Sequence, residues 1–287
     1  MIDRLVVGVD RFDRWLLGAA PKRELSGLGR GVTELCYFGL KEARACLFVA
    51  LFFAAVLVVP RGGLLGIARY DWLLLAALAI QAGMLAARLE TVDEAKAITL
   101  FHLIGFALEV FKTSAGIKSW AYPEPALSKL FGVPLFAGFM YAAVGSYIIQ
   151  AWRLLQLRIE HHPPYWMAAV VALLIYANFF THHFIGDYRW YIAALVLGLY
   201  ARATVVFRPL DRERRMPLLL GFVLTGFFIW LAENISTFFG VWQYPNQLGA
   251  WSVVHVGKWS SWSLLVIMSF TLVANLKHIK ARVHVPD

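Results

Sequence analysis

The stretch LEVFKTSAGIKSWAYP, residues 108–123, decides the fold, because the chain carries a second version of it as AENISTFFGVWQYP, residues 232–245. In both stretches a glutamate in an apolar run is followed by Trp-x-Tyr-Pro. The glutamates, Glu109 and Glu233, match at an offset of 124 residues, and the Trp-x-Tyr-Pro motifs match at 122. The repetition indicates an internal duplication in which each copy ends a helix with a carboxylate and then turns.

The composition places the chain in a lipid bilayer. Its 287 residues are 60% hydrophobic and 16% charged, and the mean hydropathy is +0.64, outside the usual range of soluble domains. Crossing the hydrocarbon takes about 20 residues of helix. The sequence therefore predicts an all-α polytopic membrane protein of about eight transmembrane helices. The predicted spans are 44–61, 71–88, 96–113, 131–152, 165–184, 190–207, 215–238 and 251–276.

The duplication divides these spans into two halves. We predict a first four-helix repeat over 44–152 and a second over 165–276. Four spans is an even number, so the two pseudo-repeats should be parallel around an axis along the membrane normal. Residues 1–43 are predicted to be an N-terminal, partly amphipathic cytoplasmic segment, and 277–287 a cytoplasmic tail.

The net charge of +9 suggests nucleic acid as a partner, but the distribution of charge favours a membrane explanation. With the N-terminus inside, most of the 27 Lys and Arg residues fall in the inner segments, as expected for cytoplasmic loops. We therefore expect a multi-pass protein of the inner (plasma) membrane with both termini cytoplasmic and no nucleic-acid partner. The oligomeric state is open. The two cysteines predict neither a disulfide framework nor a zinc site.

Ionisable side chains inside a bilayer are costly and mark functional sites. The predicted topology brings several of them to the outer third of the membrane, where we expect one shared cavity. The candidate catalytic residues are Glu109, Glu233, His182, His183, Asp187, His255 and Lys258.

A second group is expected to contact substrate: His102, Lys112, Trp120, Tyr122, Asn178, Asn234, Trp242 and Tyr244. His102 lies two helical turns before Glu109 on the same face, and Lys112 follows Glu109 by three, so these two can pair. His183 and Asp187 share a face if their helix continues. Glu233 has no cation on its own helix and should pair with Lys258 or another span, or stay protonated.

Each feature also has a structural explanation. The Trp and Tyr side chains are suited to anchoring helix ends at the membrane interface, and Glu109 with Lys112 can be a structural ion pair. A metal is a further alternative, because His182, His183, Asp187 and His255 offer ligands suited to iron or zinc. The His-Glu-x-x-His pattern is absent, and there is no phosphate-binding glycine loop, so no nucleotide is expected.

Several stretches together resemble the YoaT-like family of uncharacterised bacterial integral membrane proteins, over nearly the whole chain. They are FGLKEARACLF (38–48), FHLIGFALEVFK (101–112), SWAYPEP (119–125), GVPLFAGFMYAAVGSYIIQAW (132–152), NFFTHHFIGDYRW (178–190) and ENISTFFGVWQYP (233–245). This resemblance implies no particular activity.

A second resemblance is to the carotenoid hydratase and heterodimeric lycopene cyclase group, over about a quarter of the chain. It lies at Glu109, Trp120, Tyr122, Pro123 and Pro134, and more faintly at Glu233, Trp242, Tyr244 and Pro245. It implies carboxylic acid chemistry on isoprenoid double bonds. The Pro-x-Glu-Glu box of those cyclases is absent here, and the His-His-x-x-x-Asp segment is foreign to them.

These observations lead to one main hypothesis and three alternatives. The main one is a membrane enzyme acting on a lipid or isoprenoid at the outer leaflet, in which Glu109 or Glu233 donates a proton and the His and Asp side chains relay protons or position water. The alternatives are a metal-dependent lipid oxidase, hydroxylase or hydrolase, a proton-coupled small-molecule transporter, and a non-catalytic scaffold.

Overall fold

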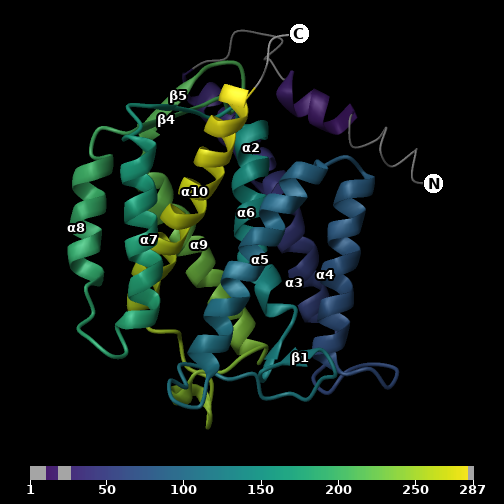
Figure 1. Cartoon of the computed structure of the whole chain (residues 1–287). Helices are drawn as coiled ribbons and strands as arrows, with labels where there is room; N and C mark the ends of the chain where they lie inside the picture. The colour runs from purple at the N-terminus through teal and green to yellow at the C-terminus, as the bar shows by residue number, and fades with distance from the viewer. Residues whose placement is uncertain (1–10, 19–26, 284–287) are drawn as a thin grey trace.

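The computed structural model describes residues 11–18 and 27–283, with side chains up to residue 278. The chain is mostly helical, as predicted, and helices occupy all eight of the apolar runs (Figure 1). The helices are α2 (Gly27–Ala45), α3 (Leu47–Val58), α4 (Arg69–Ala86), α5 (Val92–Thr113), α6 (Ala137–Leu154), α7 (Tyr165–Thr181), α8 (Arg189–Tyr200), α9 (Leu218–Phe238) and α10 (Gly257–Val283).

Residues 11–18 and 27–283 contain five short strands that the sequence analysis did not predict. β1 (Lys129–Leu130) pairs with β2 (Val133–Pro134), with Leu130 opposite Val133. The strands β3 (Arg158–Glu160), β4 (Thr204–Phe207) and β5 (Arg214–Pro217) form an antiparallel sheet in the order β3-β4-β5. We call the end of the molecule with this sheet the sheet end and the opposite end the loop end.

Some predicted span boundaries are wrong, two of them because part of an apolar run forms a short strand. The run 190–207 ends in β4, where β-branched residues pair with β5, so α8 has only 12 residues. The run 131–152 begins in the β1–β2 hairpin and becomes helical only at Ala137. The run 251–276 becomes helical only at Gly257. Apolar composition alone does not distinguish a helix from a short paired strand.

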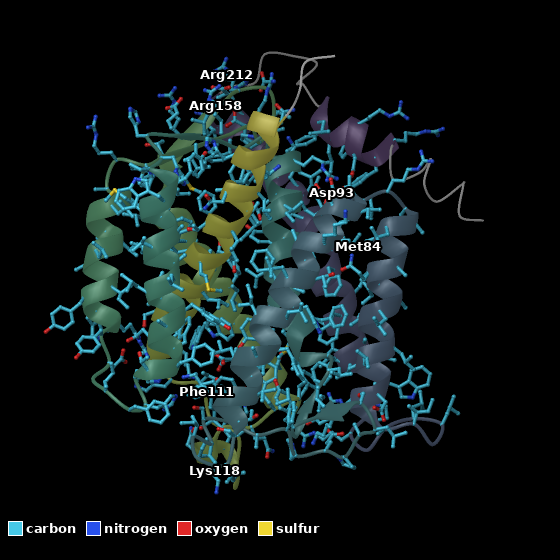
Figure 2. The ribbon with its side chains drawn as sticks, in the orientation of Figure 1. Met84, Asp93, Phe111, Lys118, Arg158 and Arg212 are labelled. Carbon is cyan, nitrogen blue, oxygen red and sulfur yellow. The ribbon has the colours of Figure 1, made fainter. Side chains whose placement is uncertain are left out.

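The loops gather at two ends in the alternation that the sequence predicts. Figure 2 shows Arg158 and Arg212 at the sheet end and Lys118 at the loop end. Hydrogen bonds join segments that are distant in the chain at the loop end. The Gly62 amide donates to Glu124 at 3.1 Å, and Ala121 exchanges backbone hydrogen bonds with Gln243.

The segment predicted as an N-terminal cytoplasmic region contains α2, which packs along α6 and is tied to the sheet end. Arg30 forms an ion pair with Asp211 at 2.7 Å, and the buried Lys41 Nζ donates to the Arg208 carbonyl at 2.8 Å. At the other terminus, α10 continues to Val283, through much of the predicted 277–287 tail. The rest of that N-terminal prediction, at 1–10 and 19–26, and residues 284–287 lie outside the described residues.

Close helix packing occurs in the third and fourth helices of each half, α5 on α6 and α9 on α10. It depends on glycine. A Cβ atom on Gly105 would lie 2.3 Å from the Tyr141 ring, and one on Gly226 would lie 2.3 Å from Ser263 Oγ and 2.7 Å from its backbone nitrogen. The two glycines allow close approach in the corresponding helix pairs but at different positions, because Gly105 lies four residues before Glu109 and Gly226 lies seven residues before Glu233.

Gly226→Ala is therefore expected to destabilise the protein by about 1–3 kcal/mol, because the α10 backbone must move to admit a methyl group. Gly83→Ala in α4 is the matched control. A Cβ atom there meets nothing within 4 Å, so alanine should stabilise the helix by about 0.5–1 kcal/mol. Thermal unfolding of the purified variants measures both changes, and equal effects of the two substitutions would contradict the packing argument.

Within the described residues, two helices are long and apolar enough to cross a membrane, judged by length and composition: Leu218–Phe238 and Gly257–His278. Leu47–Val58, Tyr165–Thr181 and Arg189–Tyr200 are apolar but shorter. In the apolar window of α9 22% of the residues are buried in the fold, against 56% in that of α10. Membrane association is thus weakly indicated by the helices themselves.

Candidate functional site

The Glu109 carboxyl group lies in a cage of three aromatic donors. Glu109 is buried, with only 3% of the residue exposed. Trp120 Nε1 donates to Oε2 at 2.8 Å, the Tyr122 hydroxyl donates to the same oxygen at 2.9 Å, and the Tyr141 hydroxyl donates to Oε1 at 2.8 Å. Two of these donors come from the Trp-x-Tyr-Pro motif of the first copy. The motif therefore binds the glutamate that precedes it.

Glu233 has the same kind of environment in the second copy and is also 3% exposed. The Tyr244 hydroxyl donates to Oε1 at 2.5 Å, and Trp262 Nε1 on α10 donates to Oε2 at 2.7 Å. Each glutamate is thus bound by the tyrosine of its own motif and by one aromatic donor from the fourth helix of its half. The sequence predicts that Glu233 pairs with Lys258 or another span; Lys258 interacts with Glu233 electrostatically without an ion pair within 4.0 Å, and Trp262 of the same helix donates the hydrogen bond.

The two motifs meet at the loop end. The Ala121 amide donates to the Gln243 carbonyl at 2.9 Å, and the Gln243 amide donates back at 3.0 Å. These are the central residues of the two Trp-x-Tyr segments, so equivalent positions form an antiparallel bridge. The Trp120 and Tyr244 rings then pack edge to face, 6.0 Å apart. The duplicated motifs build one site rather than two.

Burial, followed by the charge of Glu109, raises the pKa of Tyr122 well above its usual value. Burial and the charge of Glu233 do the same to the pKa of Tyr244. Both phenols remain protonated at physiological pH and can only donate to the carboxyl groups. Their role as fixed donors follows from this.

Lys258, in the first turn of α10, lies between the two halves. Its ammonium nitrogen is 4.7 Å from the centre of the Tyr244 ring and 5.1 Å from that of the Trp120 ring. Such cation–π contacts are attractive, more so away from water. Lys258 also interacts electrostatically with both Glu109 and Glu233. One cation is therefore shared by the two carboxyl groups.

Lys112 does not pair with Glu109, and that prediction is wrong. Its ammonium nitrogen lies 2.8 Å from His183 Nε2 and 3.3 Å from His182 Nε2. The Lys112 side chain extends from α5 to the end of α7, where the imidazoles can accept its protons, whereas the Glu109 oxygens already have three donors. The i, i+3 spacing permits a Glu109–Lys112 pair, but the tertiary packing places the two imidazoles at Lys112 instead.

His183 and Asp187 would share a helical face only if α7 continued past them, and this condition is not met, because α7 ends at Thr181. The loop that follows is held by Asn178, whose Nδ2 donates to Asp187 Oδ1 at 3.2 Å. Asp187 forms an ion pair with Arg189 at 3.2 Å. Burial acts against the carboxylate, but hydrogen bonds from the Arg189 amide and Asn178 hold the pKa of Asp187 below its usual value.

Three other predicted residues lie outside this arrangement. His102 packs against Phe139, 4.5 Å between ring centres, on the α6 side of α5. Asn234 joins the helix end to the Val254 amide at 2.9 Å. His255 is exposed and accepts a hydrogen bond from the Gly257 amide at 3.0 Å. These residues organise helix packing and the loop before α10.

The predicted metal ligands are not gathered into a binding group. His182 and His183 adjoin each other, 4.0 Å between ring centres, but the Nε2 atoms of both face Lys112, and His182 Nδ1 contacts the Asn178 carbonyl. No cluster of three or more His, Cys, Asp or Glu side chains suited to a metal occurs in the part of the chain that the structure describes.

A cavity of about 640 Å³ runs beside the caged glutamates. Eight of the predicted site residues line it: Glu109, Lys112, Trp120, His182, Glu233, Trp242, Tyr244 and Lys258. Its lining along α9 extends from Gly221 to Ser236, roughly 22 Å of helix. Between the polar ends the walls are mainly apolar side chains such as Val144, Phe228 and Leu265. The cavity is long and mainly apolar, and it is suited to an extended apolar ligand.

Among the cavity-lining residues that sequence reasoning missed are Glu42, Tyr141, Tyr147, Arg189 and Trp262. Tyr141 faces Gly105, and Trp262 is next to Ser263, which faces Gly226. These contacts join separate helices, so the sequence alone gave no signal for them. Glu42 lies at the sheet end, where it accepts a hydrogen bond from Tyr147 at 2.9 Å. It fell in the segment assigned to the cytoplasm and was not considered.

Comparison with known proteins gives a family. A family model described as "Protein of unknown function (DUF817)" matches residues 34–270. The chain is 50% identical over 251 residues to "Uncharacterized protein YoaT" of Bacillus subtilis (strain 168), covering 88% of this chain and 94% of that protein. No solved structure matches the chain.

Proposed function

The chain belongs to the DUF817 family, together with the YoaT protein that it resembles, and we propose that it is an integral membrane enzyme acting on a lipid or isoprenoid by acid–base chemistry of Glu109 and Glu233. One observation carries the proposal. The two glutamates of the duplicated motifs line a single, mainly apolar cavity beside one shared lysine.

The charges of this group suit proton transfer. Lys258 supplies one positive charge beside two carboxyl groups. In an apolar interior the least costly state has no net charge, with one carboxyl ionised and the other protonated. Two carboxyl groups in opposite states are an acid and a base. The acid gives a proton to a carbon of a double bond, while the base removes one from a neighbouring carbon or from an adding water, so the site's proton count is unchanged.

The cavity supports a substrate with a long apolar chain. Ligand sites of this volume enclose most of a small molecule's surface, and apolar walls would exclude water from a cationic intermediate while the rings of Trp120 and Tyr244 stabilise it. The faint resemblance to carotenoid hydratases and lycopene cyclases agrees with isoprenoid chemistry. We therefore propose a carotenoid-like or other isoprenoid lipid as substrate.

The proposal includes a topology of eight transmembrane helices as two parallel repeats. The matched helix pairs and the bridge between Ala121 and Gln243 support the repeat. The short helices α3 and α8 would span with the help of the helical or extended segments next to them. The arginine-rich sheet end would face the cytoplasm of the inner membrane and the loop end the outside.

This orientation predicts the labelling of two exposed loop positions. Gly116→Cys at the loop end should react with a membrane-impermeant maleimide in intact cells, whereas Arg212→Cys at the sheet end should react only after permeabilisation. Both variants need Cys36→Ala and Cys46→Ala. The reverse pattern, measured by gel shift of the labelled protein, would overturn the orientation.

The experiment that tests the function is the untargeted lipid and pigment profile of a deletion strain. We expect an apolar, isoprenoid-containing or acyl lipid to accumulate and a product to disappear, with both restored by the wild-type gene. An unchanged profile under conditions where the protein is produced would reject the enzyme proposal.

One observation favours a second candidate, a proton-coupled transporter. The cavity extends from the caged glutamates to Glu42 and Tyr147 at the sheet end, so polar groups lie at both ends of one passage. Substrate accumulation by proteoliposomes under a proton gradient, abolished by an ionophore, would favour transport over chemistry. The metal-dependent alternative gains no comparable support, since its four ligands are not brought together.

A further inference from the structure

We propose that Lys112, Arg189 and Lys258 form a binding site for an anionic head group, such as a phosphate or carboxylate, at the loop end of the cavity. The ligand would be an amphiphile whose head group lies at these cations and whose apolar chain extends along the cavity. The inference rests on the proposed function in taking the cavity as the substrate site, and it adds the chemical class of the head group.

The first support is that all three cationic side chains line the same cavity. Lys112 is 6% exposed, and its ammonium group contacts two imidazoles rather than a carboxylate. Among the described residues, neither Lys112 nor Lys258 forms an ion pair within 4.0 Å. Buried charges are normally paired. Lys258 has the two glutamates beside it, whereas the Lys112 ammonium group has only imidazole neighbours, so Lys112 points to an anion that binds there.

The second support is the electrostatic repulsion among the three cationic side chains. Lys258 and Arg189 both exert electrostatic repulsion on Lys112, and Asp187 opposes it. Asp187 is already engaged by Arg189 and Asn178. The two glutamates lie beside Lys258 but are held by their aromatic donors. A bound phosphate would relieve the repulsion and complete the hydrogen bonds of the ammonium groups.

The third support is the order of groups along the helices. Lys112 lies one turn of α5 beyond Glu109 toward the loop end, about 4.5 Å along the axis. Lys258 opens α10, and Trp262 follows one turn deeper. An amphiphile with its head at the cations would therefore place the first atoms of its chain beside Glu109 and Glu233. The head group would position the reacting carbons.

Binding to the purified full-length protein in neutral lipid nanodiscs tests this assignment without requiring turnover. The probes are dodecyl phosphate, dodecanol as the same chain without charge, and inorganic phosphate as the head group alone. The fluorescence of Trp120 and Trp262, which line the cavity, reports binding. We expect dodecyl phosphate to bind on the order of tenfold more tightly than dodecanol, the gain of charge-assisted hydrogen bonds.

Lys112→Met and Arg189→Gln should each weaken dodecyl phosphate binding on the order of three- to tenfold and leave dodecanol within about twofold. Lys118→Met is the matched control, because Lys118 is exposed at the same end, and should change neither affinity.

Equal affinity of the wild-type protein for the two amphiphiles, or unchanged dodecyl phosphate affinity in both cavity variants, would overturn the proposal. Inorganic phosphate binding as tightly as dodecyl phosphate would instead assign a free anion and reject the amphiphile. An unchanged lipid profile in the deletion strain would reject the enzyme without altering these affinities.

Discussion

Glu109→Gln and Glu233→Gln should each lower formation of the product identified in the lipid profile by about 10²- to 10⁴-fold, the usual contribution of a general acid or base. Glutamine keeps the size of the side chain and one acceptor oxygen but cannot take up or give the proton. The measurement is the amount of product per amount of membrane-inserted protein in the complemented deletion strain.

A matched control separates lost chemistry from lost folding. Glu90 is buried to the same 3% exposure as the two site glutamates and accepts hydrogen bonds from Gln81 and Ser146, but it does not line the cavity. Glu90→Gln should reduce stability by about 1–3 kcal/mol and leave product per folded protein unchanged. Wild-type product from both site variants would contradict the assigned roles.

Arg69→Met should destabilise the protein by about 3–5 kcal/mol, the cost of breaking a buried charged network at one partner. Arg69 is 2% exposed. Its guanidinium donates to Glu124 at 3.1 Å, to the Val56 carbonyl at 3.1 Å and to the Phe239 carbonyl at 2.9 Å. It thus ties the start of α4 to the loop of its own half and to the end of α9 in the other half.

Thermal unfolding of the purified protein measures this change. Arg158→Met is the control, because Arg158 forms only exposed ion pairs with Glu160 and Glu213 and should cost less than about 1 kcal/mol. Adding Glu124→Gln to Arg69→Met should recover part of the loss, since the unpaired carboxylate is then removed. Equal unfolding temperatures for the two arginine variants would show that Arg69 does not hold the halves together.

The repeated Trp-x-Tyr-Pro motif made the centre of the site predictable. Hydropathy located the helices, and the duplication indicated that Glu109 and Glu233 are equivalent. Composition could not reveal that Thr204–Phe207 leaves the helix to pair with a neighbouring strand, because that outcome depends on a partner segment ten residues later. The short strands at the sheet end were missed for this reason.

The partners of the charged groups were less predictable. The spacing along α5 allows Lys112 to pair with Glu109. In the structure, however, the end of α7 places two imidazoles at the lysine, and aromatic donors already bind the Glu109 carboxyl group. Tyr141 comes from α6, which has no charged residue at the site, and Trp262 lies on α10 one turn after Lys258 without a charge of its own, so no ionisable group marked either residue. Contacts between helices decide such pairings, and a single sequence does not contain their geometry.

The central claim, that the two copies meet to form one site, is tested most directly by a disulfide between the two motifs. A residue pair that exchanges both backbone hydrogen bonds has Cα atoms about 5.5 Å apart, within the range that a disulfide bridges. In the protein with Cys36→Ala and Cys46→Ala, Ala121→Cys with Gln243→Cys should form an intramolecular disulfide in native membranes, seen as a reducible gel shift. Ala121→Cys with the exposed Leu248→Cys should form much less. Equal cross-linking of the two pairs, or none for Ala121 with Gln243 although both cysteines react with maleimide, would contradict the shared site.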